Sequence, residues 1–484
     1  MGNHKVKKFY KSGIFLILLY VLVHGLIRLI FNDSIQVDDR EQLWYAQTLR
    51  LGYPMPQPPL YSWLGYFFFK IFGVGLTALT ILKYSIILLT FLYVDKIAKQ
   101  IYASEWIRAN LIYFFLLMPS FAWHMHQGFT HTILLGLGIV MSIFYFLKIE
   151  EKQSIKNYSL LGLSLSIGLL GKYSFVLFIL LFLISILSIK DYRVLFASRK
   201  ALFIPLIIFI LISPHLFWLI DHWSQIYSQA TTRLQIGEIT NSSFETIFKL
   251  FKSSIGFITP LFLIAFFIKR TTKTMLEDRT KKKNSELFFN RFLIFLTIFI
   301  VVFAIFFEIK QVKVRWLHPA LMVFPFWFAF YLERRNAFTK NSQRIFSYLV
   351  LFLTLLIFTL RVAQNTIGPS LGYYGRLNSP ISSSLNSIPK NIVDSASIIK
   401  TNDYNLGVHL FELFPEKIIQ ISGKEFNIDN ASSGKCLYVF DQDGHSDSSL
   451  QKNQDKFGHF DIIESKEAGH TYRLFYKVLA NEKC

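Results

Sequence analysis

Long apolar runs separated by short polar connections fill the first three quarters of the chain. An α-helix needs about 20 residues to cross a bilayer, and eleven runs come close to that length. They lie at residues 14–31, 76–94, 107–124, 129–147, 157–170, 174–189, 201–219, 250–268, 287–307, 317–332 and 345–362. This pattern predicts an all-α membrane domain over residues 1–362 with about eleven transmembrane helices.

Two shorter features refine this prediction. Residues 61–73, YSWLGYFFFKIFG, are apolar but number only about 13, which is too few to span a bilayer, so we expect an interfacial helix on the outer leaflet. Residues 157–189 have basic flanks on both sides, so the chain must turn back at Gly171, Lys172 and Tyr173. The first run follows a basic amino terminus but no cleavage site of small residues follows it, so we expect an uncleaved helix.

The composition changes after residue 362, where Asn, Ser, Asp and Gly replace the long apolar runs. We therefore expect residues 363–484 to form a separate, small soluble α/β domain. Its predicted strands are 397–400, 417–421, 436–440 and 472–478, and its predicted helix is 406–414.

Basic residues are distributed unevenly among the connections. Alternate connections, beginning with residues 1–13, hold 26 Lys and Arg, whereas the connections between them hold 7. The positive-inside rule then places the amino terminus in the cytoplasm and residues 363–484 in the periplasm of a multi-pass protein of the bacterial inner membrane. The net charge of +20 comes from these dispersed clusters rather than from one basic domain, so we expect no nucleic-acid partner.

The composition supports a membrane protein and excludes a cysteine-based metal or redox site. Charged residues make up 17% of the chain, against about 25% in soluble proteins. The two cysteines, Cys436 and Cys484, have no zinc or redox spacing. In the periplasm a disulfide between them could persist.

An acidic pair, Asp38 and Asp39, directly follows the first apolar run and its short polar end. One interpretation is structural, since Asp39 could cap a helix over residues 40–51 that Gly52 terminates. The other is catalytic: one carboxylate acts as a general base that accepts a proton from an acceptor, and its neighbour orients it. Both aspartates are therefore candidate catalytic residues.

The segment DDREQLWYAQTLRLGYPMPQPPLYSWL, which begins at Asp38, resembles the first periplasmic loop of glycosyltransferase 39-like enzymes. This family includes lipid A aminoarabinose transferases, rhizobial lipopolysaccharide galacturonosyltransferases and, more distantly, protein mannosyltransferases. The shared pattern is an acidic pair, a short helix and a turn like the one from Gln57 to Trp63. The segments AWHMHQGFTHT, GLLGKYSF, PHLFW and KVRWLHP look like further features of the bacterial branch.

This resemblance implies a GT-C fold, with a multi-helix membrane domain and interfacial helices after the first span. It also implies Asp38 as catalytic base, a polyprenyl-phosphate sugar as donor, and lipid A or lipopolysaccharide core as acceptor. Gln57 and Tyr61, which flank the rigid turn at Pro58 and Pro59, become candidates for substrate binding. No second nucleophilic carboxylate is evident, so we expect inversion at the anomeric carbon.

Three cations are candidates for binding the phosphate of the donor. Lys83 and Lys172 lie at or beside apolar helices, where an ionisable group without a partner is costly. Lys83 could instead extend to the outer interface. Arg315 lies in an external loop that is basic against the positive-inside bias, and its planar fork binds two phosphate or carboxylate oxygens together.

Polar residues near the outer ends of other helices are candidates for substrate binding, namely His126, His131, Tyr173, Lys313 and His318. The spacing of His126 and His131 is not that of a helical metal pair. We therefore expect no cofactor, although a divalent metal stays an open alternative. Neither a Walker motif nor GxGxxG is present, which argues against a nucleotide-sugar donor.

Two other classes of function stay open at this stage. A non-enzymatic transporter or flippase of lipid-linked sugars would explain the helices and Lys83, but not the acidic pair followed by an interfacial helix. A structural protein of an envelope complex would leave Lys83 and Lys172 unexplained. The sequence does not identify the sugar, because both galacturonic acid and aminoarabinose occur among relatives.

Overall fold

The computed structural model describes residues 2–31, 35–234, 283–306, 317–334, 340–371, 379–421, 435–441, 458–467 and 470–479, with isolated residues between 248 and 261. The chain divides into two compact units. The first unit comprises Met1–Val23, Leu49–Leu64 and Lys83–Ile357, and the second comprises His24–Thr48, Gly65–Leu82 and Phe358–Cys484. The second unit thus joins the carboxyl-terminal residues to two segments from the start of the chain. The predicted boundary at residue 362 stays a prediction.

Five described helices are long and apolar enough to cross a membrane, and a bent pair would make six. The five lie in α4 (Leu76–Ile101), α7 (Thr130–Glu151), η2 with α11 (Arg199–Leu202 and Phe203–Asp221), α14 (Lys283–Phe306) and α17 (Lys340–Thr366). The bent pair is α9 (Phe175–Leu187) with α10 (Lys190–Phe196). The predicted number of eleven is not confirmed, and most of the run 250–268 lies outside the described residues.

The other apolar runs form shorter or interrupted helices. In α1 (Gly2–Ile30) the apolar part is Phe15–Ile30. The run 107–124 is interrupted, because α5 (Glu105–Leu116) ends shortly before Pro119 and a π-helix, η1 (Ser120–His124), follows. The run 317–332 divides into α15 (His318–Leu321) and α16 (Phe324–Arg334). The runs 107–124 and 317–332 therefore do not each form one continuous helix.

The turn predicted at Gly171 to Tyr173 is present, between α8 (Ile155–Gly171) and α9. Close packing of α7 against α8 accompanies it. A Cβ added to Gly138 of α7 would lie 2.6 Å from the Cα of Gly168 in α8. Small residues allow helix backbones to approach in this way within membranes.

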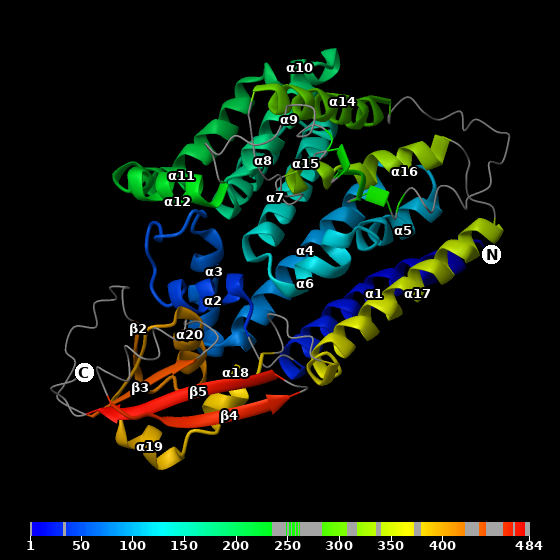
Figure 1. The fold of residues 1–484 in the computed structure, drawn as a ribbon. Helices are drawn as coiled ribbons and strands as arrows, with labels where there is room; N and C mark the ends of the chain where they lie inside the picture. Colours follow the sequence, from blue (N-terminus) through cyan, green and yellow to red (C-terminus); the bar gives the residue numbers. More distant parts are fainter. Residues whose placement is uncertain are drawn as a thin grey trace. The chain divides into compact units, whose positions relative to one another are not determined.

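The remaining helices described within residues 2–234 are short. They are α2 (Val37–Tyr45), α3 (Leu60–Phe72), α6 (Met125–Gln127) and α12 (Trp223–Leu234). The helix α3 coincides with the predicted interfacial segment and has the predicted length. In Figure 1, α1 and α17 run side by side, and the rings of His24 and Phe358 meet edge to face.

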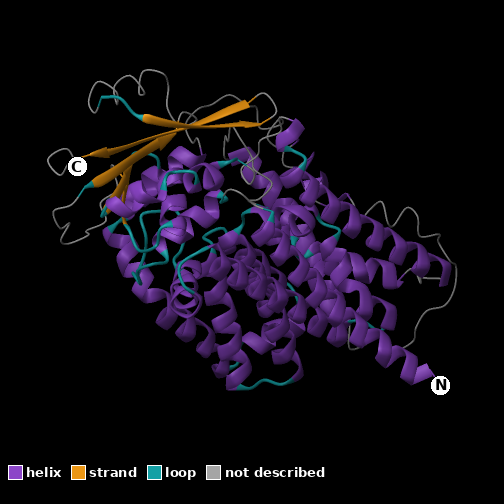
Figure 2. Cartoon of the chain, turned by 90° about the horizontal axis from the view of Figure 1, so that it is seen from below, coloured by secondary structure: helices purple, strands orange, loops and turns teal. Residues whose placement is uncertain are grey.

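The carboxyl-terminal part of the second unit contains a five-stranded sheet in the order β2-β1-β3-β5-β4. Its strands are β1 (Ile398–Thr401), β2 (Ile418–Ile421), β3 (Cys436–Asp441), β4 (Asp461–Glu467) and β5 (His470–Leu479). The first three pair in parallel, whereas β5 runs antiparallel to β3 and β4. Four strands coincide with the predicted ones, and β4 was not predicted. Figure 2 shows the strands as one twisted layer.

Alternate strand residues build a core on each face of this sheet. One face packs Ile399, Leu437 and Leu474 against α18 (Ile381–Asn386), α19 (Lys390–Ser395) and α20 (Tyr404–Leu413). Cys436, Phe440 and Phe475 form a smaller cluster on the other face. Cys436 is buried and disulfide-bonded, and Cys484 lies outside the described residues.

Candidate functional site

The acidic pair lies within the first turn of α2 in the second unit. The helix begins at Val37 and ends at Tyr45, and its N-cap Gln36 makes no side-chain capping bond. The structural interpretation, in which Asp39 caps a helix over residues 40–51, is therefore wrong at both ends. Two carboxylates in the first turn are favoured by the positive end of the helix dipole, which is consistent with α2 starting three residues earlier, at Val37.

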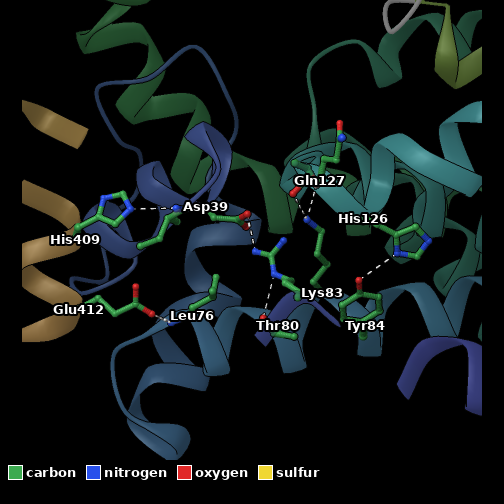
Figure 3. Close-up of polar contacts among 12 residues, drawn as sticks. Asp39, Leu76, Thr80, Lys83, Tyr84, His126, Gln127, His409 and Glu412 are labelled. Carbon is green, nitrogen blue, oxygen red and sulfur yellow. Dashed lines mark hydrogen bonds and ion pairs between the residues drawn. The ribbon is translucent and has the colours of Figure 1, made fainter. Parts of the chain in front are cut away.

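Asp39 forms a buried ion pair with Arg28 of α1. The Oδ2 atom of Asp39 lies 2.5 Å from Nη2 of Arg28, and both side chains are 1% exposed. The Nε–H of Arg28 donates to Oγ1 of Thr80 in α4 at 3.0 Å (Figure 3). A guanidinium in an apolar helix requires such partners, because an uncompensated buried charge is strongly destabilising.

Asp38 is half-buried, unlike its neighbour. One carboxylate of the pair is thus engaged by a cation and withdrawn from solvent, while the other is partly accessible. A general base must reach the proton that it removes. The two candidates therefore differ in their surroundings, since Asp39 is buried against Arg28 and Asp38 keeps partial access to solvent.

Two titratable residues of α20 lie in the same unit. Burial raises the pKa of Glu412 above its ordinary value, although the bond from the Leu76 N–H acts in the opposite direction. Burial lowers the pKa of His409 to about 4. Since burial penalises the charged form of each group, His409 is neutral at physiological pH.

Lys83 is fully buried in the first unit. Its Nζ donates to the backbone oxygen of Gly128 at 2.5 Å and to that of Gln127 at 3.3 Å (Figure 3). A lysine that extends to the interface would expose its ammonium group. The structure instead shows Lys83 holding the carbonyl end of α6.

His126 lies between two tyrosines. Its Nε2 is 2.6 Å from the hydroxyl of Tyr20, and its Nδ1 is 3.1 Å from the hydroxyl of Tyr84. Tyr84 immediately follows Lys83 in α4, so this helix fixes both ends of the segment from His126 to Gly128. Both ring nitrogens of His126 are engaged within the protein.

The segment around His126 has unusual backbone geometry. It follows the π-helix η1, and Phe129, with φ 66° and ψ 36°, occupies the left-handed region just before α7. Bulky residues rarely adopt that conformation, and strain of this kind persists only where surrounding contacts determine it. Here the Phe129 ring stacks on His124 with 5.7 Å between centroids.

A second polar cluster of the first unit surrounds the turn between α8 and α9. Lys172 Nζ donates to Oγ1 of Thr132 at 2.7 Å, and Nδ1 of His131 lies 3.1 Å from the oxygen of Gly171. The Tyr61 ring lies 5.8 Å from that of His131. Three predicted site residues, Tyr61, His131 and Lys172, therefore gather at one place.

Tyr173 extends this cluster toward α11. Its hydroxyl lies 2.9 Å from Nε2 of His215, whose Nδ1 lies 2.9 Å from the backbone oxygen of Leu51. His215 belongs to the segment PHLFW but was not singled out as a site residue. The segment before the proline turn is thereby tied to α9 and α11.

The other predicted substrate-binding residues have different surroundings. His318 is buried and lines a small, mostly apolar cavity of about 20 Å³ together with Phe129 and Thr132. Gln57 is half-buried, and its backbone N–H donates to Met55. Lys313 and Arg315 lie outside the described residues, and their roles stay predictions.

Several residues of these clusters were not anticipated from the sequence. Arg28 could have been found, because an ionisable side chain within an apolar run is a signal of function or pairing. Tyr20 and Tyr84 carry no comparable signal among the chain's 23 tyrosines. His409 and Glu412 contact residues that are distant in the sequence, so no local pattern signals them.

The described residues contain no group of three or more His, Cys, Asp or Glu side chains that could hold a metal ion. In the second unit Asp38 is a partly accessible carboxylate. In the first unit Lys83 and Lys172 are each held by hydrogen bonds to oxygen atoms of the protein.

Comparison with known proteins gives agreeing results. Residues 56–218 match the dolichyl-phosphate-mannose-protein mannosyltransferase family. The chain is 26% identical over 441 residues to the lipopolysaccharide core galacturonosyltransferase RgtB of Rhizobium johnstonii, covering 89% of this chain and 87% of RgtB. It is 22% identical over 412 residues to RgtA, the lipopolysaccharide core galacturonosyltransferase of the same organism, covering 84% and 81%.

Among solved structures, the fold is similar to that of ArnT from Cupriavidus metallidurans. The structure bound to undecaprenyl phosphate matches 96% of this chain and 97% of ArnT, with a TM-score of 0.58 and 12% identity. The apo structure matches 96% and 98%, with a TM-score of 0.57 and 13% identity. The resemblance expected from the sequence is confirmed: the chain has a GT-C fold and is a multi-pass membrane glycosyltransferase.

Proposed function

We propose that the protein transfers one glycosyl unit from a polyprenyl-phosphate sugar to lipid A or lipopolysaccharide core on the periplasmic side of the bacterial inner membrane. The observation that carries this proposal is the acidic pair on α2, where Asp39 is neutralised by Arg28 and Asp38 stays partly accessible. The fold of the chain is similar to that of ArnT, one structure of which holds undecaprenyl phosphate, and this likeness supports a polyprenyl-phosphate donor.

Asp38 is the proposed general base. It accepts the proton of the acceptor oxygen as that oxygen bonds to the anomeric carbon, and the bond from that carbon to the carrier phosphate breaks with inversion. Lys83, Lys172 and Arg315 are the proposed ligands of the departing phosphate, because fixed cations stabilise charge that develops on a leaving group.

The remaining candidates are proposed to bind sugar or acceptor. They are Gln57, Tyr61, His126, His131, Tyr173, Lys313 and His318. We favour galacturonic acid as the sugar, because RgtA and RgtB are galacturonosyltransferases. That both are transferases also favours an enzyme over a non-enzymatic flippase. No metal is part of the proposed chemistry.

The test is mass spectrometry of lipid A and core oligosaccharide from a deletion strain that carries each variant. Asp38→Asn is expected to reduce the rate of product formation by about 10² to 10⁴ while the protein stays folded in the membrane. Glu464→Gln, at an exposed ion pair with Arg473, is the matched control and should retain activity. An Asp38→Asn protein within a few-fold of wild type would refute the assignment of the base.

A further inference from the structure

The helix α20 contacts the acidic helix α2 and the residues just before it, although some 360 residues separate them in the sequence. Both helices belong to the second compact unit. One side of α20 packs Leu406 and Leu410 into the core of the sheet domain. Tyr404, His409 and Phe411 contact the amino-terminal segments of the same unit, at three points in or just before α2.

The first point is just before α2 begins. The backbone N–H of Ile35 donates to Nε2 of His409 at 3.1 Å, and His409 is 0% exposed (Figure 3). Nδ1 of the same ring lies 2.7 Å from the oxygen of Asn405. The ring must therefore be neutral, with its proton on Nδ1, because Nε2 accepts a hydrogen bond.

The second and third points are the middle and the end of α2. The hydroxyl of Tyr404 donates to the backbone oxygen of Arg40 at 3.3 Å. The ring of Trp44 meets those of Tyr404 and Phe411 edge to face, with centroids 6.2 and 6.4 Å apart. Such aromatic pairs have defined geometry and fix the rotation of α2 about its axis.

Glu412 reaches α2 indirectly, through α4. Its Oε1 accepts the N–H of Leu76, the first residue of α4, at 2.8 Å. A carboxylate at this position satisfies a helix donor that lacks a partner within the helix. One turn later α4 carries Thr80, which accepts from Arg28, and Arg28 pairs with Asp39.

We infer that α20 positions the acidic pair for catalysis, with His409 and Glu412 as positioning residues for Asp38. This inference rests on the proposed function, in which Asp38 is the base. His409 fixes where α2 starts, and Glu412 fixes the helix that supplies the partner of Arg28. Displacement of a reacting group by about 1 Å can lower a rate by about 100-fold, so loss of either contact slows the reaction.

The experiment compares variants that keep a hydrogen-bond acceptor with variants that remove it, in the full-length protein in nanodiscs. His409→Leu and Glu412→Leu are expected to lower turnover by about 10- to 100-fold. His409→Gln and Glu412→Gln retain an oxygen that can accept from Ile35 or Leu76, and are expected to stay within about threefold of wild type. Glu464→Gln is again the surface control.

A second measurement separates positioning from general disruption. The dissociation constant of undecaprenyl phosphate should change by less than about twofold in both leucine variants, while hydrogen exchange of the α2 peptide rises. The inference is overturned if the leucine variants keep wild-type turnover, or if turnover and undecaprenyl phosphate affinity fall together. If Asp38→Asn alone proves fully active, the proposed function fails, which is a distinguishable result.

Discussion

The guanidinium of Arg28 and the carboxylate of Asp39 lie 2.5 Å apart, from Nη2 to Oδ2, and neither side chain is more than 1% exposed. The two charges belong to α1 and α2, which are separated in sequence only by a short polar connection. Their pairing allows a positively charged residue to sit near the end of an apolar helix. It also holds α2, and with it Asp38, in a fixed orientation.

A double-mutant cycle should show strong energetic coupling between Arg28 and Asp39. Arg28→Met or Asp39→Leu leaves one buried charge without its partner, and we expect each to lower the free energy of unfolding by about 3–5 kcal/mol. The double variant removes both charges and should lose clearly less than the sum. Thermal unfolding in detergent measures this cycle, and additive losses would contradict a direct pair.

The three proposed phosphate ligands can be tested through binding alone. Lys83→Met, Lys172→Met and Arg315→Met each remove one cation, and we expect about tenfold weaker binding of undecaprenyl phosphate for each, since a hydrogen bond to a charged group contributes about 1.5–3 kcal/mol. Titration of nanodiscs with undecaprenyl phosphate measures the dissociation constant. Lys99→Met, which removes the exposed lysine of an ion pair with Asp95 on α4, is the control.

Unchanged affinity in all three variants would remove the proposed phosphate site. Unchanged affinity in Lys83→Met alone would leave that lysine with a structural role, which its bonds to the Gln127 and Gly128 carbonyls already provide.

The close packing of α7 against α8 leads to a prediction about stability. A Cβ at position 138 would lie 2.6 Å from the backbone of Gly168, whereas one at position 136 would meet only the flexible end of Met322, at 3.2 Å. We expect Gly138→Ala to destabilise the protein by about 1–3 kcal/mol through overpacking, and Gly136→Ala to have a much smaller effect. The midpoints of thermal unfolding in detergent compare them, and equal midpoints would argue against close backbone packing.

His409 should make stability depend on pH. Burial lowers its pKa from 6.5 to about 4, while Asn405 and Asp403 act in the opposite direction and Arg40 in the same one. Between these two pH values the unfolded chain binds a proton at His409 that the folded chain does not. The free energy of unfolding is therefore not reduced by this group above pH 6.5, and it falls as the pH drops toward 4. The loss approaches about 3 kcal/mol.

His409→Gln removes this titration, so its unfolding midpoint should fall less than that of wild type between pH 6.5 and 4.5. Glu412, whose pKa is raised by burial, contributes with the opposite sign and is present in both proteins. Its effect therefore cancels in the comparison. Parallel curves for the two proteins would show that His409 is not the titrating group.

Much of the local structure could be predicted from the sequence because it depends on short-range periodicity. The strands at 398–401 and 436–441 and the turn at Gly171 to Tyr173 follow from alternation, apolar runs and glycine placement. The strand β4 was not predicted, because four of the seven residues in its sequence DIIESKE are charged. The helix α2 was placed three residues too late, because its start is held by His409 and Arg28 rather than by a local cap.

The sequence by itself determined that this is a membrane protein with an acidic pair after its first helix, and it identified the resemblance to a glycosyltransferase family. Apolar length and residue identity carry that information directly. Only the tertiary structure decided that Asp39 is buried against Arg28 while Asp38 keeps partial access to solvent, since Arg28, Asp39 and Thr80 come from three helices. It also decided that α20 contacts α2, because a hydrogen bond between Ile35 and His409 depends on how the whole unit packs and leaves no periodic signal in either segment.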